Sequence, residues 1–509
     1  MTGVPHTAEG DQEAALAFLD QNVRRGIAKR VDTHISIVFL EPGRVLKIKR
    51  AVRLPFLDFS TLDKRKAACE AELAVNRRFA PHIYRRVVPI TSGADGPEIA
   101  GDGPVVEWAV EMDRFDESKT FDHLARTGAL RPELAEAMAE AIRDSHTSAE
   151  ASDGASWLAS LAPIIDRNIR KFREHSLLAR EAVERLRQSS HQRLAAARSL
   201  LEARAAAGMV RRCHGDAHLG NIVLIDDKPV MFDAIEFDPA IATTDILYDL
   251  AFPLMDLVHF GLPVAANRLF NRYLQAAWQE NAPALSLLPL FLSIRAAIRA
   301  HVLLTRSEQS GGDANDALEA KAYFDLALQF LAPARPSLIA IGGKSGTGKS
   351  VLARDAAPWV GPLPGAVILR SDVIRKELHG VDPLVALPET AYGPEVTARV
   401  YRALDQRAGE VIAQGFSVIV DAAFLRESER DALSASARKL AADFRPIFLD
   451  ADLSLRVQRI ASRRHDASDA TGEIASSQEG YDIGRLDWPV VDASGSPEQT
   501  LERSLIHPG

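Results

Sequence analysis

The chain has 509 residues, enough for about three folding units, and its 47% hydrophobic and 26% charged residues are ordinary for a soluble globular protein. Its formal net charge of −8 argues against non-specific binding to duplex nucleic acid, because that binding relies on a positive protein surface. Two distant cysteines exclude a disulfide framework, the N-terminus lacks the regions of a signal peptide, and the most apolar stretch (282–294) is too short to cross a bilayer. We therefore expect a cytoplasmic protein without membrane association.

The first part of the chain predicts a small lobe rich in strands. Its apolar spacing and β-branched content predict, in chain order, a helix over 11–30, strands over 34–40 and 44–50, a helix over 62–79 and a strand over 105–112. Glu41-Pro42-Gly43 between the first two strands indicates a hairpin. We expect an N-terminal helical extension over 1–30 and a strand-rich lobe over about 31–115.

The middle of the chain is predominantly helical. Residues 121–207 have helical spacing and many Ala, Arg and Glu residues, and they are followed by short strands in NIVLID and KPVMFD. Further helices run to about residue 307, a polar glycine-bearing loop covers 307–317, and one more helix reaches Leu331. We expect a helical lobe over about 116–331.

A proline-containing linker at 332–336 precedes a part of different character. Pro333 and Pro336 favour extended backbone there. Beyond it, apolar strands alternate with helical segments: LIAIGG, AVILRSD, SVIVDAA, RPIFLDA and WPVVDAS. This alternation predicts a parallel α/β sheet over 337–509, with a last helix that Ser496 and Gln499 start as a capping box. The two halves do not resemble each other.

A phosphate-binding loop carries the most specific signal in the sequence. It reads Gly343-Lys344-Ser345-Gly346-Thr347-Gly348-Lys349-Ser350 and satisfies G-x-x-x-x-G-K-S between an apolar strand and a helix. The backbone N–H groups of such a loop wrap a phosphate, and the helix N-terminus adds its dipole. Lys349 should contact the β- and γ-phosphates of a nucleotide, and the Ser350 hydroxyl should ligate Mg²⁺.

Two aspartates follow strands of the same sheet. Asp372, in a segment that also carries Arg375, is placed to accept a proton from an attacking hydroxyl, or to cap a helix that begins at Val373, or both. Asp421 ends the strand SVIVD in the Walker-B pattern and is the candidate carboxylate near Mg²⁺, with a plain strand-end aspartate as the alternative.

Arg459 and Arg463 lie four residues apart ahead of a polar segment. On a helix they would share a face and could clamp a transferred phosphoryl group, or they could form a solvated basic face.

GGKSGTGKS, LRSDVIRKEL, SVIVDAAF and RIASRRHDASDA together resemble the P-loop kinase group that includes gluconate kinases, zeta toxins and polynucleotide 5′-hydroxyl kinases, over roughly 337–505. The resemblance implies that Asp372 is the base and that arginines of the lid bind phosphates. It gives the class of reaction and leaves the acceptor open.

A second polar motif, CHGDAHLGN, precedes the strand IVLI. It places Asp216 five residues before Asn221, and Asp233 follows the next strand. A kinase-type catalytic centre uses an aspartate toward the substrate hydroxyl, with an asparagine and a second aspartate on Mg²⁺. The sequence therefore predicts Asp216 as base and Asn221 and Asp233 as metal ligands, with a polar turn or an inactive kinase-like fold as alternatives.

This motif resembles the aminoglycoside phosphotransferase and small-molecule kinase superfamily, over roughly 31–305. The resemblance implies a two-lobed protein-kinase-like fold, with His214 as a structural support of the loop and Asp249 as a structural aspartate that follows it. It also implies that Lys47 contacts the α- and β-phosphates, with Lys49 on the same strand face as the alternative. Glu72 is the expected ion-pair partner of Lys47, with Glu70 as its alternate.

The departure from protein kinases is that no G-x-G-x-x-G loop is present in the first strands. The whole chain resembles a bacterial architecture in which such a domain is fused to a P-loop domain. We therefore expect an ATP- and Mg²⁺-dependent phosphotransferase with two kinase-like modules and a small-molecule hydroxyl acceptor. One active kinase regulated by the P-loop domain, and a nucleotide-sensing scaffold, are the alternatives.

Overall fold

The computed structural model describes residues 8–54, 57–94, 96–309, 313–463 and 466–506. Parts of several sequence expectations lie outside the described residues: 1–7 of the N-terminal extension, 310–312 of the polar loop, 464–465 of the arginine-rich segment and 507–509 of the P-loop domain. The chain divides into two compact units, residues 1–163 with 201–256 and residues 164–200 with 257–509. The linker expected at 332–336 thus lies inside the second unit, and the division into functional domains remains a prediction.

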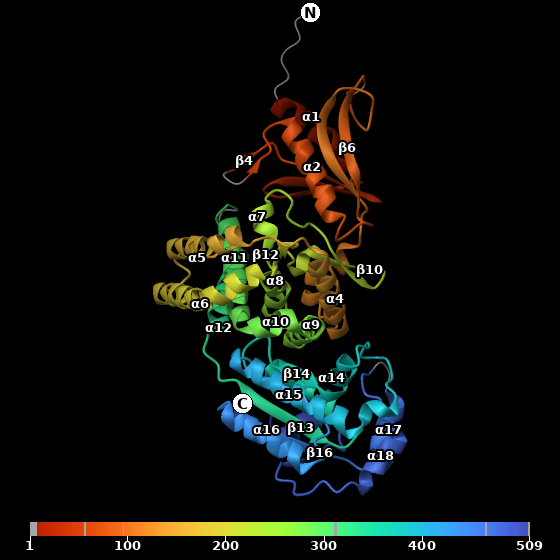
Figure 1. The fold of residues 1–509 in the computed structure, drawn as a ribbon. Coiled ribbons are helices and arrows are strands. Elements are labelled where there is room, and N and C mark those ends of the chain that lie inside the picture. The colour runs from red at the N-terminus through yellow and green to blue at the C-terminus, as the bar shows by residue number, and fades with distance from the viewer. Residues whose placement is uncertain (1–7, 55–56, 95, 310–312, 464–465, 507–509) are drawn as a thin grey trace, which may run out of the picture. The chain divides into compact units, whose positions relative to one another are not determined.

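The first unit contains an antiparallel sheet of six strands (Figure 1). In sheet order these are β1 (Lys29–Asp32), β2 (Ser36–Glu41), β3 (Arg44–Lys49), β8 (Val105–Met112), β6 (Tyr84–Gly93) and β7 (Gly96–Ile99). Three of them, β2, β3 and β8, match the predicted strands. The others are short, or, like β6, contain charged residues and a proline that weaken the strand pattern.

Helices α1 (Ala8–Arg24) and α2 (Leu62–Asn76) pack with this sheet. Ala15 and Leu19 of α1 are buried in one core cluster with side chains of β2 and β3, whereas α2 contributes Cys69 to a second cluster. The expected N-terminal extension is therefore part of the lobe, and α1 ends six residues earlier than the predicted 11–30 because the chain turns through Gly26 at φ +70°.

The elements that follow confirm the helical reading of 121–207. They are α3 (Phe121–Arg126), α4 (Pro132–Ser148), α5 (Ala155–Glu174) and α6 (Arg180–Ala206). After β9 (Val210–Arg212), strands β10 (Ile222–Ile225) and β11 (Lys228–Met231) form an antiparallel ribbon, and α7 (Pro239–Ala242) leads to β12 (Thr243–Asp245), which pairs with β9.

The helices after β12 are α8 (Ile246–His259), α9 (Pro263–Ala276), α10 (Trp278–Asn281), α11 (Leu288–Gln309) and α12 (Ala314–Phe330). By length and composition alone the stretch Trp278–Gln309 could cross a membrane, and it is longer than the apolar segment noted in the sequence. However, 78% of its most apolar window is buried inside the structure, as in the core helix of a globular protein.

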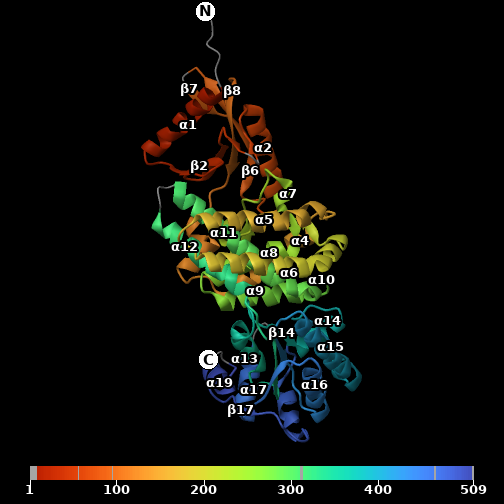
Figure 2. The ribbon, with the colours of Figure 1, turned by 90° about the vertical axis from the view of Figure 1, so that its left-hand side faces the viewer.

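The second unit contains a parallel sheet of five strands, as the sequence predicted. In sheet order the strands are β14 (Val367–Arg370), β15 (Val418–Asp421), β13 (Ser337–Gly343), β16 (Asp443–Asp450) and β17 (Val490–Asp492). Figure 2 shows α13 (Lys349–Ala356) and α19 (Pro497–Ser504) on one side of it and α15 (Pro394–Ala413) and α16 (Glu427–Lys439) on the other. The remaining helices are α14 (Ser371–Leu378), α17 (Leu453–Ser462) and α18 (Gly472–Ser477). The predicted Ser496–Gln499 capping box is present at α19.

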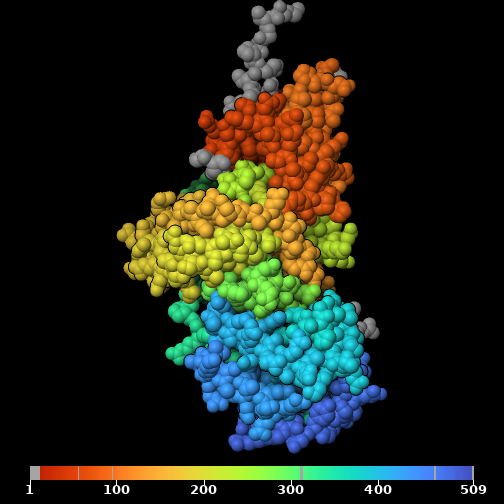
Figure 3. Space-filling model, viewed as in Figure 1, coloured from red at the N-terminus to blue at the C-terminus, as the bar shows by residue number. Residues whose placement is uncertain are grey.

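Helix α9 covers the edge strand β14. The Asn271 side chain donates from Nδ2 to Ala366 O at 3.1 Å and accepts from Ile368 N at 2.7 Å, and Asn267 Nδ2 also donates to Ala366 O at 3.1 Å. Phe270 packs against Phe416 with ring centroids 5.8 Å apart. In the space-filling view, green atoms of the residues before the linker lie next to cyan atoms of the P-loop region (Figure 3). Side-chain amides thus satisfy the outer edge of β14, which no further strand joins among the described residues.

Candidate functional sites

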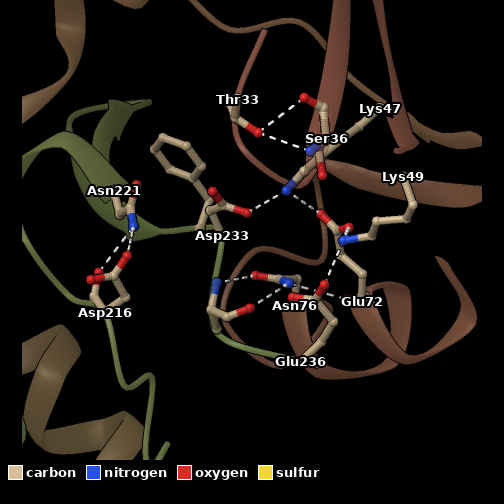
Figure 4. A network of polar contacts seen from close by, with 12 residues as sticks. Thr33, Ser36, Lys47, Lys49, Glu72, Asn76, Asp216, Asn221, Asp233 and Glu236 are labelled. Carbon is tan, nitrogen blue, oxygen red and sulfur yellow. Dashed lines mark hydrogen bonds and ion pairs between the residues drawn. The ribbon is translucent and has the colours of Figure 1, made fainter. Parts of the chain in front are cut away.

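Strand β3 presents Lys47 and Lys49 to the same face, where Glu72 of α2 lies between the two ammonium groups (Figure 4). Lys47 Nζ lies 2.7 Å from Glu72 Oε1 and Lys49 Nζ lies 2.6 Å from Glu72 Oε2. Lys47 continues to Asp233 Oδ1 at 2.5 Å, whereas the fully buried Lys49 pairs with Glu236. The expected Lys47–Glu72 ion pair is present. Lys47 is the lysine that reaches Asp233.

The backbone at Asp233 is held in an uncommon conformation, with φ +61°. Its N–H donates to the Tyr84 hydroxyl at 3.1 Å, and the next residue, Ala234, exchanges hydrogen bonds with the Asn76 amide through both its N–H and its C=O. These contacts from β6 and α2 aim the carboxylate at Lys47. The Asp233 side chain remains 43% exposed, so it is open to a ligand.

The loop between β9 and β10 brings Asp216 and Asn221 together. Asn221 Nδ2 donates to the backbone oxygen of Asp216 at 3.0 Å and to its Oδ2 at 3.2 Å (Figure 4). Asp249 Oδ1 accepts from Gly215 N at 2.9 Å, and His214 Nε2 donates to Phe232 O at 3.0 Å, next to Asp233. These contacts agree with the structural roles that the resemblance implied for His214 and Asp249.

Gly215 itself is required by the loop. Its φ is +84°, and a Cβ at this position would lie 2.8 Å from the Cβ of Ala242. A side chain would therefore push the loop away from the structure that carries it.

In the first site, burial and the paired charges have opposite effects on the pKa values of Lys47 and Asp233. Burial disfavours the charge on Lys47, but Asp233 and Glu72 outweigh it and raise the pKa of Lys47 well above its ordinary value. Burial alone would raise the pKa of Asp233, but Lys47 lowers it. Both groups therefore remain charged at neutral pH, and Lys47 neutralises a carboxylate that is expected to hold metal.

Residues that sequence reasoning missed support this centre from behind. Gln12 of α1 donates to Lys49 O at 2.9 Å and to Glu107 Oε2 at 2.6 Å, and its Oε1 accepts from Ala51 N at 2.9 Å. Glu107 also accepts from Arg65 Nε of α2 at 2.8 Å. This buried network ties α1, the end of β3 and α2 together. Because α2 carries Glu72, the network helps to fix the position of Glu72 relative to β3.

In the second unit the P-loop runs from the end of β13 into α13. Lys349 Nζ donates to the backbone oxygens of Gly343 and Lys344 at 2.9 and 3.0 Å, so its ammonium group lies inside the loop. The Ser350 hydroxyl donates to Asp421 Oδ2 at 2.5 Å. Strands β13 and β15 pair directly, which brings the two predicted metal ligands together.

The tip of the P-loop is held by residues that sequence reasoning did not select. Gln478 Oε1 accepts from Ser345 N at 2.7 Å, and the buried Arg456 donates to Ser345 O at 3.2 Å. Glu479 pairs with Arg456 and, at 2.9 Å, with Lys344. Gly346 is needed for this packing, because its φ is +86° and a Cβ would lie 2.6 Å from Arg456 O.

Asp372 lies in the first turn of α14, which begins at Ser371 with Arg370 at the cap position. The helix cap expected of Asp372 is therefore not formed. Burial and the charge of Asp421 raise the pKa of Asp372, against the lowering effects of Arg370, a hydrogen bond with Ser468 and the Lys349 charge. A partly buried carboxyl with a raised pKa next to a P-loop suits a proton acceptor.

The three arginines of the second site lie in different surroundings. Arg375 donates to Ala391 O at 2.8 Å and lies over the ring of Tyr392, so its contacts are with the segment ahead of α15. Arg459 donates to Gly495 O at 2.9 Å and its Nη1 lies beside the P-loop at Thr347 O, 3.5 Å away. Arg463 is not on a shared helix face with Arg459, because α17 ends at Ser462 and Arg463 has extended backbone. Its charge nevertheless acts on Lys349.

Both sites offer oxygen ligands of the kind that Mg²⁺ prefers. In the first, Asn221 commits its Nδ2 to Asp216, which leaves its amide oxygen for a metal beside the half-exposed carboxylate of Asp233. In the second, the Ser350 hydroxyl and the Asp421 carboxylate are already in contact. The donor chemistry therefore fits Mg²⁺ in both places.

Comparison with known families separates the same two regions. A model described as "Phosphotransferase enzyme family" matches residues 45–284, and a model described as "AAA domain" matches residues 338–479. The expectation of a phosphotransferase-like region followed by a P-loop region is thereby supported, and the mixed α/β fold class is confirmed.

One relative extends over nearly all of this chain, whereas the solved structures match only part of it. A protein of Mycobacterium tuberculosis described as uncharacterized is 27% identical over 487 residues, which are 92% of this chain and 93% of that protein. A gluconokinase structure from Sinorhizobium meliloti is 22% identical, covers 33% of this chain and 90% of its own, and has a TM-score of 0.24. A choline/ethanolamine kinase family protein from Mesorhizobium loti is 14% identical, covers 63% of this chain and 99% of its own, and has a TM-score of 0.36.

Proposed function

We propose that the chain is an ATP-dependent phosphotransferase with two kinase-like modules, each of which transfers the γ-phosphoryl group to a hydroxyl of a small-molecule acceptor. The observation that carries the proposal is that each module brings a lysine, oxygen ligands for Mg²⁺ and a candidate base to one place. Two unrelated phosphate-binding designs would thus both be complete in one chain.

In the first module, Lys47 would bind the α- and β-phosphates, and Asn221 and Asp233 would hold Mg²⁺. Asp216, fixed by two contacts with Asn221, would orient the acceptor hydroxyl and accept its proton. The Lys47–Glu72 pair supports this arrangement, since it keeps the ammonium group beside the metal carboxylate.

In the second module, the backbone N–H groups of Gly343–Ser350 and the ammonium group of Lys349 would hold the β- and γ-phosphates. Ser350 and Asp421 would hold Mg²⁺, which when bound offsets phosphate charge. Asp372 would accept the proton of the acceptor hydroxyl, and Arg459 and Arg463, near the P-loop, would bind phosphate oxygens. Arg375 would act through the position of the segment ahead of α15.

The proposal is tested by a transfer assay with γ-labelled ATP and Mg²⁺ over sugars, aminoglycosides, nucleosides and 5′-hydroxyl oligonucleotides. The full chain is compared with Asp216→Asn and with Asp372→Asn, so that each labelled product is assigned to one module. We expect at least one acceptor to lose its label in only one of these variants.

Exposed carboxylates outside both sites provide matched controls. Asp227→Asn in the first unit and Asp431→Asn in the second make the same chemical change on the surface and should leave transfer unchanged. Label transfer that persists in both site variants, or an ATP turnover that depends on neither aspartate, would contradict the proposal. Nucleotide binding without any transfer would favour a nucleotide-sensing role.

A further inference from the structure

Arg370, at the junction of two strand ends, has no role in the proposed chemistry. It is the last residue of β14, and the parallel register places it beside Asp421, the last residue of β15. Both side chains therefore emerge at the carboxyl edge of the sheet, where ligands bind in folds of this type. Only 17% of the Arg370 side chain and 5% of the Asp421 side chain are exposed, so water screens the pair poorly.

The guanidinium group shares a carboxylate oxygen with a proposed metal ligand. Arg370 Nε lies 3.3 Å from Asp421 Oδ2, and the Ser350 hydroxyl donates to this same oxygen at 2.5 Å. On its other side, Arg370 Nη2 donates to Asp466 Oδ1 at 2.9 Å. One cation therefore joins the expected Mg²⁺ position to the chain that follows α17.

The charges around Arg370 explain why a cation is held there. Burial disfavours the charged guanidinium, but Asp421, Asp466 and Asp372 outweigh burial and raise the pKa of Arg370. A divalent cation at Ser350 and Asp421 would place two further positive charges beside the guanidinium group. Two positive charges that share one carboxylate repel each other strongly where water screens them poorly. The Arg370 guanidinium group and a divalent metal ion would therefore compete for Asp421.

We propose that Arg370 is the internal counter-ion of Asp421 in the metal-free site, and that Mg²⁺ displaces it from Asp421 while its contact with Asp466 remains. Arg370 is then a positioning residue that couples the arrival of the metal to the segment after α17. The inference rests on the proposed function in one respect, the assignment of Ser350 and Asp421 as metal ligands.

The test measures Mn²⁺, a paramagnetic substitute for Mg²⁺, by electron paramagnetic resonance without nucleotide. The full chain carries Asp233→Asn to weaken the other metal site. Arg370→Met removes the competing charge at similar side-chain length, and we expect it to tighten Mn²⁺ binding by about tenfold, equivalent to about 1.4 kcal/mol. Arg370→Lys keeps the charge and should stay near the parent affinity. Asp421→Asn, added to Arg370→Met, should remove the tightened site.

If Arg370→Met is less stable than the parent, the melting temperatures of the same variants, measured with and without Mn²⁺, provide a second test. Loss of the counter-ion should lower the melting temperature in chelator, and Mn²⁺ should restore it in Arg370→Met more than it stabilises the parent. Equal Mn²⁺ affinity in Arg370→Met and the parent would overturn the inference, as would a loss of stability that Mn²⁺ does not restore.

Failure of the proposed function would look different. If Lys349→Ala left nucleotide binding at the P-loop unchanged, the P-loop kinase assignment would fail. The competition between Arg370 and metal, measured without nucleotide, would be unaffected by that result.

Discussion

Asp216 and Asp233 lie in one site but should affect different steps. Asp216 faces Asn221, whereas Asp233 pairs with Lys47 and is half exposed. Asp216→Asn should therefore lower the transfer rate by about 10²–10⁴-fold with little change in nucleotide affinity, because only proton acceptance and acceptor alignment are lost. Asp233→Asn should instead weaken Mg²⁺-dependent nucleotide binding.

Calorimetric titration with ATP, with and without Mg²⁺, separates these two effects when it is run beside the transfer assay. The same binding defect in both variants would mean that the roles are not divided in this way. The Lys349→Ala background removes the signal of the other site from the titration.

Asp372 has a second consequence, for stability. Because burial and Asp421 raise its pKa in the folded state, its contribution to stability is fully present below the unfolded pKa and is lost as pH rises through the folded pKa. Asp372 therefore contributes less to stability at pH 7 than it does at low pH. Asp372→Asn should stabilise the protein by on the order of 1 kcal/mol at pH 7 while transfer by the second module is lost.

Thermal or denaturant unfolding from pH 7 toward pH 4 checks this expectation. The advantage of Asp372→Asn should shrink as pH falls, because the parent carboxyl then becomes protonated. In the parent, transfer by this module should decline on the acid side at a pH above that of an ordinary aspartate. An advantage that grows toward low pH would contradict the assignment.

Helix α9 and strand β14 act as one element of structure. Asn271 accepts from Ile368 N and donates to Ala366 O, which also accepts from Asn267, so Asn271→Ala leaves the Ile368 N–H of the edge strand without this partner. Unsatisfied groups of this kind cost about 1–3 kcal/mol. We expect hydrogen exchange of the Ile368 amide to accelerate about 5- to 150-fold.

Mass spectrometry of peptides that cover 366–370 measures this exchange. Gln275→Ala, on the same helix and without a side-chain hydrogen bond among the described residues, is the matched control and should change nothing. Unchanged exchange in Asn271→Ala would show that backbone pairing with β15 alone holds β14.

Local sequence patterns predicted individual strands and the P-loop, but not the contacts between residues that are distant in sequence. Strands such as β3 and β8 were predictable because their apolar residues alternate or run continuously, and the P-loop because its glycines have a fixed spacing. The partners of Arg370 were not, because Asp421 and Asp466 are distant in sequence from it and from each other, and only the folded chain brings them together. Gln12 was missed for the same reason, since its partners Lys49 and Glu107 come from two later strands.

At the scale of the whole molecule, the two lysines that we propose to bind phosphate belong to different compact units. Lys47 works with strand and loop residues of the first unit, and Lys349 with the P-loop of the second. The full chain should therefore bind two nucleotides in saturating Mg²⁺. Lys349→Ala should remove one of them and Lys47→Ala the other.

Equilibrium dialysis with labelled ATP measures this stoichiometry, with Lys66→Ala as a control that should retain two sites, because the Lys66 ammonium group lies over the Trp108 ring and pairs with Glu70. A stoichiometry of one in the parent chain would refute two working sites. It would favour an inactive first module, or one that binds nucleotide only with its acceptor.

The sequence predicted both fold types and the motifs within them, but it did not predict how the chain is divided. Pro333 and Pro336 correctly indicated a break in helical structure, yet they do not end a compact unit. The contacts of Asn267 and Asn271 with β14 make the P-loop sheet continuous with helices that precede the linker. Side-chain amides on a helix carry no sequence signal for the strand that they will meet.

The cover that α9 provides for β14 has a consequence during synthesis. Domains generally form in the order in which the ribosome delivers them, and α9 is made well before β14. Strand β14 of the nascent sheet can therefore pack against α9 as soon as β14 is formed. Its opposite edge, β17, has only three residues and offers little to pair with. Chains that emerge side by side from one polysome are prone to pair through exposed edge strands. Here a neighbouring chain would find neither edge of the parallel sheet available.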